Sequence, residues 1–156
     1  LLVVALDQYS KGLAQSALEY GRPLEVFAWF NLTLQYNTGA AFSFLSDAGG
    51  WQRYFFSVVA VVISAVLVVW LYRMPRQQRL LAVALALILG GALGNVWDRL
   101  LFGHVVDFIS VHYGGHYFPA FNIADSAISV GAALMIFDSL FGREVAAPAQ
   151  RGLDSR

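Results

Sequence analysis

The chain has 156 residues, of which 58% are hydrophobic and only 13% are charged, and its mean hydropathy is +0.61. A soluble domain of this size has too much surface to hide so much apolar area, and a disordered chain is more polar, so both classes are excluded. Ten basic residues balance ten acidic ones, so a basic nucleic-acid-binding surface is excluded, and the absence of cysteine excludes disulfides and thiolate chemistry. The composition therefore predicts an integral membrane protein.

Four apolar segments predict an α-helical membrane protein with four transmembrane helices, at about 1–20, 54–72, 80–99 and 119–140. The second segment holds no charged residue and approaches the ~20 residues that cross a hydrocarbon core. The first opens with LLVVAL and is interrupted by Asp7 and Lys11. We interpret it as a span that continues before Leu1. A cleaved signal peptide is the alternative, but its charges normally precede the apolar run.

Arginines predict how the chain crosses the membrane. Three of them lie in the loop 73–79, and the tail adds Arg143, Arg151 and Arg156. Because Lys and Arg accumulate in cytoplasmic loops, this loop and both termini are expected inside, and the segments 21–53 and 100–118 outside. Residues 1–142 then form a single membrane domain, followed by a cytoplasmic tail, 143–156, that is expected to be disordered.

The two outward segments carry strand patterns. Residues 24–37 alternate with a period of two, and Gly114-Gly115 separates two short strand-like runs, which is typical of a hairpin. A small outward-facing β-sheet at the membrane interface is therefore predicted. Residues 38–50 are rich in glycine and alanine, and we expect them to act as a lid, although a packed turn would look similar.

Charged residues at membrane depth need a partner or a task. Asp7 and Lys11 lie four residues apart on one helical face, which favours a self-neutralising pair. The motif Gly90-x-x-x-Gly94 favours close helix packing.

Asn95, Asp98 and Arg99 follow this motif within one turn. A structural network between Asp98 and Arg99 is expected, whereas Asn95 and Arg99 share a face that could reach a site.

Asp107 and Asp125 are harder to explain structurally. Asn122 and Asp125 could form a capping box, but Asp107 interrupts the apolar strand VVDFI, where capping offers no reason for it. Two carboxylates in one low-dielectric pocket share a proton, so that one acts as base and the other as acid around a water molecule. This is the chemistry of an aspartic protease. A helix N-terminus favours negative charge, which makes Asp125 the better candidate for the ionised member.

Other chemistries fit less well. A zinc site at His112 and His116 would need a helix, which Gly114-Gly115 breaks, so no metal or cofactor is expected. A small transporter or proton channel with a relay of buried acids is the alternative from another class. Its site would lie at the bilayer midplane, whereas these aspartates are expected near the outer edge.

Five blocks in register resemble the lipoprotein signal peptidases (signal peptidase II) of bacteria. They are Asp7-x-x-x-Lys11, 37–42 (NTGAAF), 90–99 (GGALGNVWDR), 105–108 (VVDF) and 118–126 (FPAFNIADS). The resemblance covers the chain from its start to the fourth predicted span.

The resemblance implies an aspartic endopeptidase of the bacterial inner membrane that removes the signal peptide of diacylglyceryl-modified prolipoproteins, before the lipidated cysteine of the lipobox. It implies Asp107 and Asp125 as the catalytic dyad. Asn37, Gly39, Asn95, Arg99 and Asn122 match residues that line the substrate or inhibitor site, and Asp7, Lys11 and Asp98 match supporting positions. The expected partners are these substrates, membrane lipids and globomycin-type cyclic peptides, bound by a monomer.

Overall fold

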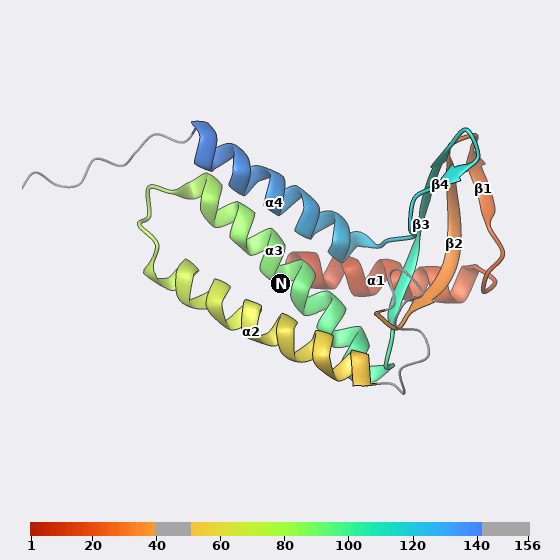
Figure 1. Cartoon of the computed structure of the whole chain (residues 1–156), viewed down its shortest axis with the longest axis horizontal. Coiled ribbons are helices and arrows are strands. Elements are labelled where there is room, and N and C mark those ends of the chain that lie inside the picture. The colour runs from red at the N-terminus through yellow and green to blue at the C-terminus, as the bar shows by residue number, and fades with distance from the viewer. Residues whose placement is uncertain (40–50, 142–156) are drawn as a thin grey trace, which may run out of the picture.

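The computed structural model describes residues 1–39 and 51–141, with backbone alone for Gln52 and Arg53 (Figure 1). The predicted tail, 143–156, and all but the first two residues of the predicted lid, 38–50, lie outside the described residues.

The structure has four helices: α1 (Leu2–Ala17), α2 (Trp51–Arg73), α3 (Arg79–Leu101) and α4 (Ile123–Phe141). Helices α2, α3 and α4 run alongside one another, and α1 is inclined to them and extends from α3 toward the sheet (Figure 1). In the described part of the chain, α2, α3 and α4 are long and apolar enough to cross a membrane. Helix α1 has 16 residues, fewer than the ~20 that span a bilayer, so the expectation of four spans stays a prediction.

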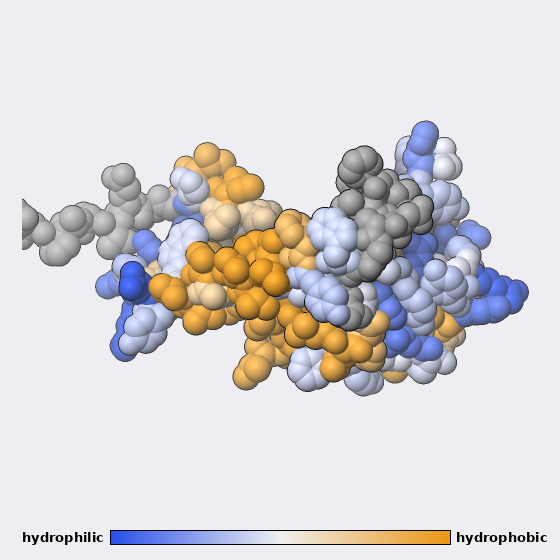
Figure 2. Space-filling view, turned by 60° about the horizontal axis from the view of Figure 1, so that its bottom comes forward, coloured by the Kyte–Doolittle hydropathy of each residue, from blue (hydrophilic) through white to orange (hydrophobic). Residues whose placement is uncertain are grey.

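The surface of the bundle is apolar between two hydrophilic ends. Figure 2 shows this apolar region over the helices, with hydrophilic residues at the sheet and at the opposite end. Helix α2 exposes valines along its length, with Val58 and Val62 both more than half exposed. Such a surface suits hydrocarbon better than water.

Four antiparallel strands pack across one end of the helices in the order β1 (Leu24–Phe27), β2 (Phe30–Asn37), β3 (Val105–Tyr113) and β4 (His116–Tyr117) (Figure 1). The period-two pattern of residues 24–37 is thus divided between two strands. The predicted glycine hairpin is confirmed, because Gly114 and Gly115 take φ values of 56° and 82° and His112 pairs with Tyr117. Glycine adopts such left-handed angles without steric cost.

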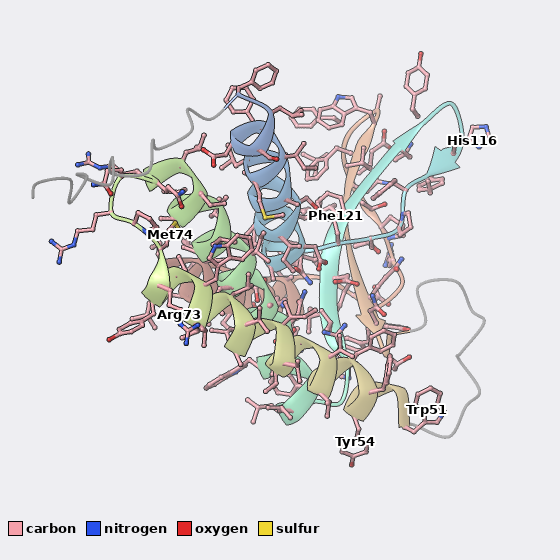
Figure 3. All side chains as sticks on the ribbon, turned by 60° about the vertical axis from the view of Figure 1, so that its left-hand side comes forward. Trp51, Tyr54, Arg73, Met74, His116 and Phe121 are labelled. Atoms are coloured by element: carbon pink, nitrogen blue, oxygen red, sulfur yellow. The ribbon has the colours of Figure 1, made fainter. Side chains whose placement is uncertain are left out.

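Helix α4 begins later than predicted. Its first residue is Ile123, because the backbone of Phe121 bonds to strand β3 instead of entering the helix. The N–H group of Phe121 donates to the carbonyl of Ile109 at 3.0 Å, and the carbonyl of Phe121 accepts from the N–H group of Ile109 at 2.9 Å. Figure 3 shows Phe121 between the strand and the helix. This link joins the two elements that carry the predicted dyad.

Glycines of α3 allow the predicted close packing on two sides. A Cβ atom on Gly90 or Gly94 would meet Val3 or Asp7 of α1 at 2.8 Å or less. A Cβ atom on Gly91 would overlap the carbonyl oxygen of Ala124 at the start of α4. Helix α3 therefore fits between α1 and α4 through its glycine surface.

Gly91→Ala should lower the thermal unfolding temperature in detergent, because the new methyl group meets backbone that cannot rotate away. Overpacking of this kind costs typically about 1–3 kcal/mol. Gly12→Ala is the matched control, since its Cβ atom meets nothing within 4 Å and alanine favours a helix over glycine by about 1 kcal/mol. Equal unfolding temperatures for the two variants would contradict the packing described for α3 and α4.

Candidate active site

Asn122 connects the two predicted catalytic aspartates. Its Nδ2 donates to Asp107 Oδ1 at 2.8 Å, its backbone N–H donates to Asp125 Oδ2 at 3.3 Å, and its Oδ1 accepts from the N–H of Asp125 at 2.9 Å. The last two bonds form the capping box expected for the start of α4. Asn122 is fully buried. Because this one residue makes both cap bonds and also donates to Asp107, the helix cap and the carboxylate pair occupy the same site.

Two further asparagines donate to the remaining carboxylate oxygens. Asn37 on β2 donates from Nδ2 to Asp107 Oδ2 at 3.1 Å, and Asn95 on α3 donates from Nδ2 to Asp125 Oδ1 at 2.8 Å. All four carboxylate oxygens thus accept a hydrogen bond. Strand pairing brings Asn37 close, because β2 and β3 align Gln35 with Asp107.

Gly39 fixes the orientation of the Asn37 amide. Its N–H donates to Asn37 Oδ1 at 2.8 Å, which turns the amide nitrogen toward Asp107. Two features exclude a side chain at position 39. The φ angle of Gly39 is 100°, which favours glycine, and a Cβ atom there would lie 2.6 Å from the ring of Phe56.

The pKa of Asp107 is raised from 3.8 to about 7, mainly by burial and in the same direction by the negative charge of Asp125. The hydrogen bonds from Asn37 and Asn122 and the positive charge of Lys11 oppose this rise. A carboxyl group with a pKa near 7 holds its proton at the pH where an unperturbed aspartate has lost it. Asp107 is therefore suited to act as the acid of the pair.

The raised pKa of Asp107 predicts a pH-dependent stability. Between its ordinary value of 3.8 and about 7 the folded protein binds more protons than the unfolded chain, so the free energy of unfolding falls as pH rises through this range. Asp107→Asn lacks this titration, so its unfolding temperature should fall less between about pH 4 and about pH 7. Thermal unfolding of both proteins in detergent checks this, and equal falls would contradict the raised pKa.

Asn95, Arg99 and Asp125 line the polar end of a cleft of about 340 Å³. The other walls are mainly apolar and come from three helices, with Phe56 and Ile63 on α2, Ile88 on α3 and Ile128 on α4. The cleft can therefore hold an apolar chain with its polar end at Asp125. The predicted shared face of Asn95 and Arg99 is confirmed by this arrangement.

The predicted network between Asp98 and Arg99 is wrong. Arg99 donates from Nη1 to the carbonyl of Asn95 at 3.3 Å and lies 5.8 Å from the ring centre of Phe56. Asp98 turns to the other side of α3 and pairs with Lys11 at 2.9 Å. Consecutive residues of a helix point about 100° apart, so a partner on α1 takes Asp98 away from its neighbour.

The predicted pair of Asp7 and Lys11 is confirmed, with Nζ 2.7 Å from Asp7 Oδ2. Lys11 also donates to Asn95 Oδ1 at 3.1 Å, and therefore belongs to a larger buried network. Sequence reasoning missed two members of this region, Gln8 in the network and Phe56 in the cleft wall. A polar residue within an apolar run was the available signal for Gln8, whereas Phe56 resembles any lipid-facing residue.

His112 and His116 lie in the β3–β4 hairpin, where the ring of His112 stacks on Tyr117 at 4.6 Å. Within residues 1–39 and 51–141, no group of three His, Cys, Asp or Glu side chains is arranged to hold a metal ion.

Comparison with known proteins gives consistent matches along the chain. The family model described as signal peptidase (SPase) II matches residues 1–141. The lipoprotein signal peptidase of Teredinibacter turnerae is 55% identical over 146 residues, which cover 94% of this chain and 87% of that protein. The lipoprotein signal peptidase of Pseudomonas fluorescens is 59% identical over 140 residues, with coverages of 88% and 82%.

Solved structures agree with these matches. A bacterial membrane enzyme determined by the in meso method at 1.9 Å resolution superposes with a TM-score of 0.80 and 36% identity, over 91% of this chain and 90% of that one. A second one, at 2.3 Å, gives a TM-score of 0.78 and 34% identity, over 94% of this chain and 90% of that one.

Proposed function

The chain belongs to the signal peptidase II family, and from this premise we propose that it is an aspartic endopeptidase that cleaves diacylglyceryl-modified prolipoproteins. It removes their signal peptide by cutting before the lipidated cysteine of the lipobox. The observation that carries the proposal is the pair of carboxylates, Asp107 and Asp125, joined by Asn122 beside an apolar cleft.

In the proposed reaction the two aspartates hold one water molecule and one proton. The ionised Asp125 takes a proton from the water as its oxygen attacks the scissile carbonyl carbon. Asp107 gives its proton to the carbonyl oxygen, which produces a neutral tetrahedral diol. The diol collapses when Asp125 passes its proton to the leaving nitrogen and a diol hydroxyl returns a proton to Asp107. The peptide bond is then broken, and the carboxyl groups regain their starting states.

The surrounding residues have separate roles in this proposal. Asn37, Asn95 and Asn122 orient the carboxylates, and Gly39 orients Asn37. Arg99 contributes a positive charge at the polar end of the cleft, within electrostatic range of Asp107 and Asp125. The apolar walls accept the acyl chains or the signal-peptide helix. A globomycin-type cyclic peptide with an acyl tail suits the same cleft.

We further propose that the protein acts as a monomer in the bacterial inner membrane, with its termini in the cytoplasm and the sheet at the outer face. Helix α1 then belongs to the first of four spans. Figure 3 supports opposite sides for the two ends, since Arg73 and His116 lie at opposite ends of the molecule.

Reporter fusions test this orientation. A reporter fused after Gln77, in the arginine-rich loop, should be active in the cytoplasm, because basic loops stay inside. A reporter inserted after Gly115, in the β3–β4 turn, should be active outside. The reverse pattern would contradict the proposed position of the active site.

A cleavage assay with the purified protein tests the function. Two peptides with the same lipobox, one carrying a diacylglyceryl cysteine and one unmodified, are compared in lipid-containing micelles. We expect cleavage of the lipidated peptide, inhibition by globomycin and little cleavage of the unmodified one. An equal rate for both would indicate an unspecific membrane protease, and no cleavage of either would favour the transporter or proton-channel alternative.

A further inference from the structure

We propose that Lys11 and Gln8 are positioning residues that set the spacing of the two proposed catalytic aspartates. They do so by cross-linking two other carboxylates, Asp7 and Asp98. Each of these carboxylates accepts a hydrogen bond from the backbone N–H group of the residue directly before one of the catalytic aspartates. The four side chains of Asp7, Gln8, Lys11 and Asp98 are called the clamp below. The inference rests on the proposed function, since it concerns the geometry of the proposed catalytic pair.

One arm of the clamp reaches helix α4. Asp7 Oδ1 accepts a hydrogen bond from the N–H of Ala124 at 2.9 Å, and Ala124 is the residue directly before Asp125. The other oxygen of Asp7 accepts from Lys11 Nζ at 2.7 Å. The missing side chain of Gly94 leaves room for this carboxylate, because a Cβ atom there would lie 2.7 Å from Asp7 Oδ2.

The other arm reaches strand β3. Asp98 Oδ2 accepts a hydrogen bond from the N–H of Val106 at 3.1 Å, and Val106 is the residue directly before Asp107. The same oxygen pairs with Lys11 Nζ at 2.9 Å. The ammonium group of Lys11 therefore joins the backbone of both aspartate-bearing elements through one carboxylate each.

Gln8 makes a second cross-link beside the ammonium group. Its Nε2 donates to Asp98 Oδ1 at 2.7 Å and to Asp7 Oδ2 at 3.2 Å, with the carbonyl of Gly94 also at 3.2 Å. Gln8 is uncharged, so its removal changes the geometry of the clamp without changing the charge near the dyad.

The arrangement does more than neutralise charge. Asp7 and Asp98 are fully buried and Lys11 is 2% exposed, so their charges interact at low dielectric and depend strongly on geometry. A pair that only neutralised charge would need one acid and one base. Here one base, Lys11, pairs with two acids. Each acid also accepts a hydrogen bond from the backbone N–H group of the residue directly before a proposed catalytic aspartate. Lys11 also helps to orient the side chain of Asn95, because its Nζ donates to Asn95 Oδ1 at 3.1 Å.

Positioning residues act on turnover more than on binding. A displacement of about 1 Å between reacting groups costs up to ~10²-fold in rate. The substrate cleft is lined by other residues than the clamp, so KM should change little. The expected signature is therefore a lower kcat with KM nearly unchanged.

Gln8→Met, with Gln15→Met as control, is the first test. Both variants make the same chemical change on α1, but Gln15 is exposed and lies outside the clamp. Turnover of the lipidated peptide, normalised to folded protein by size exclusion, should fall about tenfold or more in Gln8→Met. The control should match the parent, and KM should stay within about threefold in both. An unchanged kcat in Gln8→Met, or a loss seen only in KM, would overturn the inference.

The second test removes all three charges together. The triple variant Asp7→Asn/Lys11→Met/Asp98→Asn leaves no unpaired buried charge, and its amide oxygens can still accept from Ala124 and Val106. If the clamp positions the dyad, the highest kcat over the pH profile stays below that of the parent although the protein is folded. If Lys11 acted only through its charge on Asp107, the pH optimum would shift and the highest kcat would match the parent. Should the triple variant not fold, Gln8→Met decides the question. A parent protein that does not cleave the lipidated peptide would instead contradict the proposed function itself.

Discussion

Asp107→Asn, Asp125→Asn and the double variant should be about equally inactive. Removing a positioned acid or base typically lowers a rate by ~10²–10⁴-fold, and both aspartates are proposed to act in the same step. Residues that act as a unit fail together, so the second substitution should add little to the first. Turnover of the lipidated peptide by the three purified variants gives the measurement.

The same variants separate catalysis from helix capping. Asparagine is a good residue near a helix start, so the capping role of Asp125 alone predicts a loss of ~1 kcal/mol in stability with cleavage preserved. Asp138→Asn, at the far end of α4, is the matched control and should keep the parent turnover. Turnover within a few-fold of the parent in either single dyad variant would rule out the aspartic mechanism.

Asn122→Asp should abolish most activity while leaving helix α4 intact. Aspartate is as good an N-cap as asparagine, but it places a third carboxylate where Nδ2 now donates to Asp107 at 2.8 Å. Three carboxyl groups in one buried site disfavour one another's ionisation, including that of Asp125. The hydrogen bond that the Asn122 amide donates to Asp107 is lost as well. We expect a loss of about 10²-fold or more in kcat near neutral pH.

Asn122→Ser is the companion variant. Serine also caps a helix but adds no charge, so its loss should be smaller than that of Asn122→Asp at equal stability. Both variants are compared by turnover and by thermal unfolding in detergent. Equal turnover in the two would show that charge at this position does not matter, contrary to the account of the paired carboxylates.

Local patterns predicted local structure well. The Gly114-Gly115 turn and the pair of Asp7 and Lys11 each depend on residues within four positions of one another, and both are present. The sequence also predicts a capping box at Asn122 and Asp125, as an alternative to a catalytic role for Asp125. The structure contains the capping box, and the side chain of the same asparagine also donates to Asp107. Both contacts are possible because a side-chain amide has a donor and an acceptor.

The failures occurred where a distant element competes with a local pattern. Hydropathy alone extends the fourth helix back to residue 119, whereas the backbone at Phe121 pairs with β3. Asp98 and Arg99 are neighbours in sequence, but Asp98 finds its cation on α1. Nothing local to Asn37 indicates Asp107 as its partner, since 70 positions separate them. The family resemblance supplied Asn37 and Gly39, and strand pairing explains why they matter.

The most direct measurement of the central claim is the mass of the fragments that the parent and the Asp107→Asn/Asp125→Asn variant release from one lipidated lipobox peptide. We expect two fragments from the parent, cut immediately before the lipidated cysteine, and intact peptide from the folded double variant. The same two fragments from the double variant, or a cut at another bond by the parent, would contradict the proposed function.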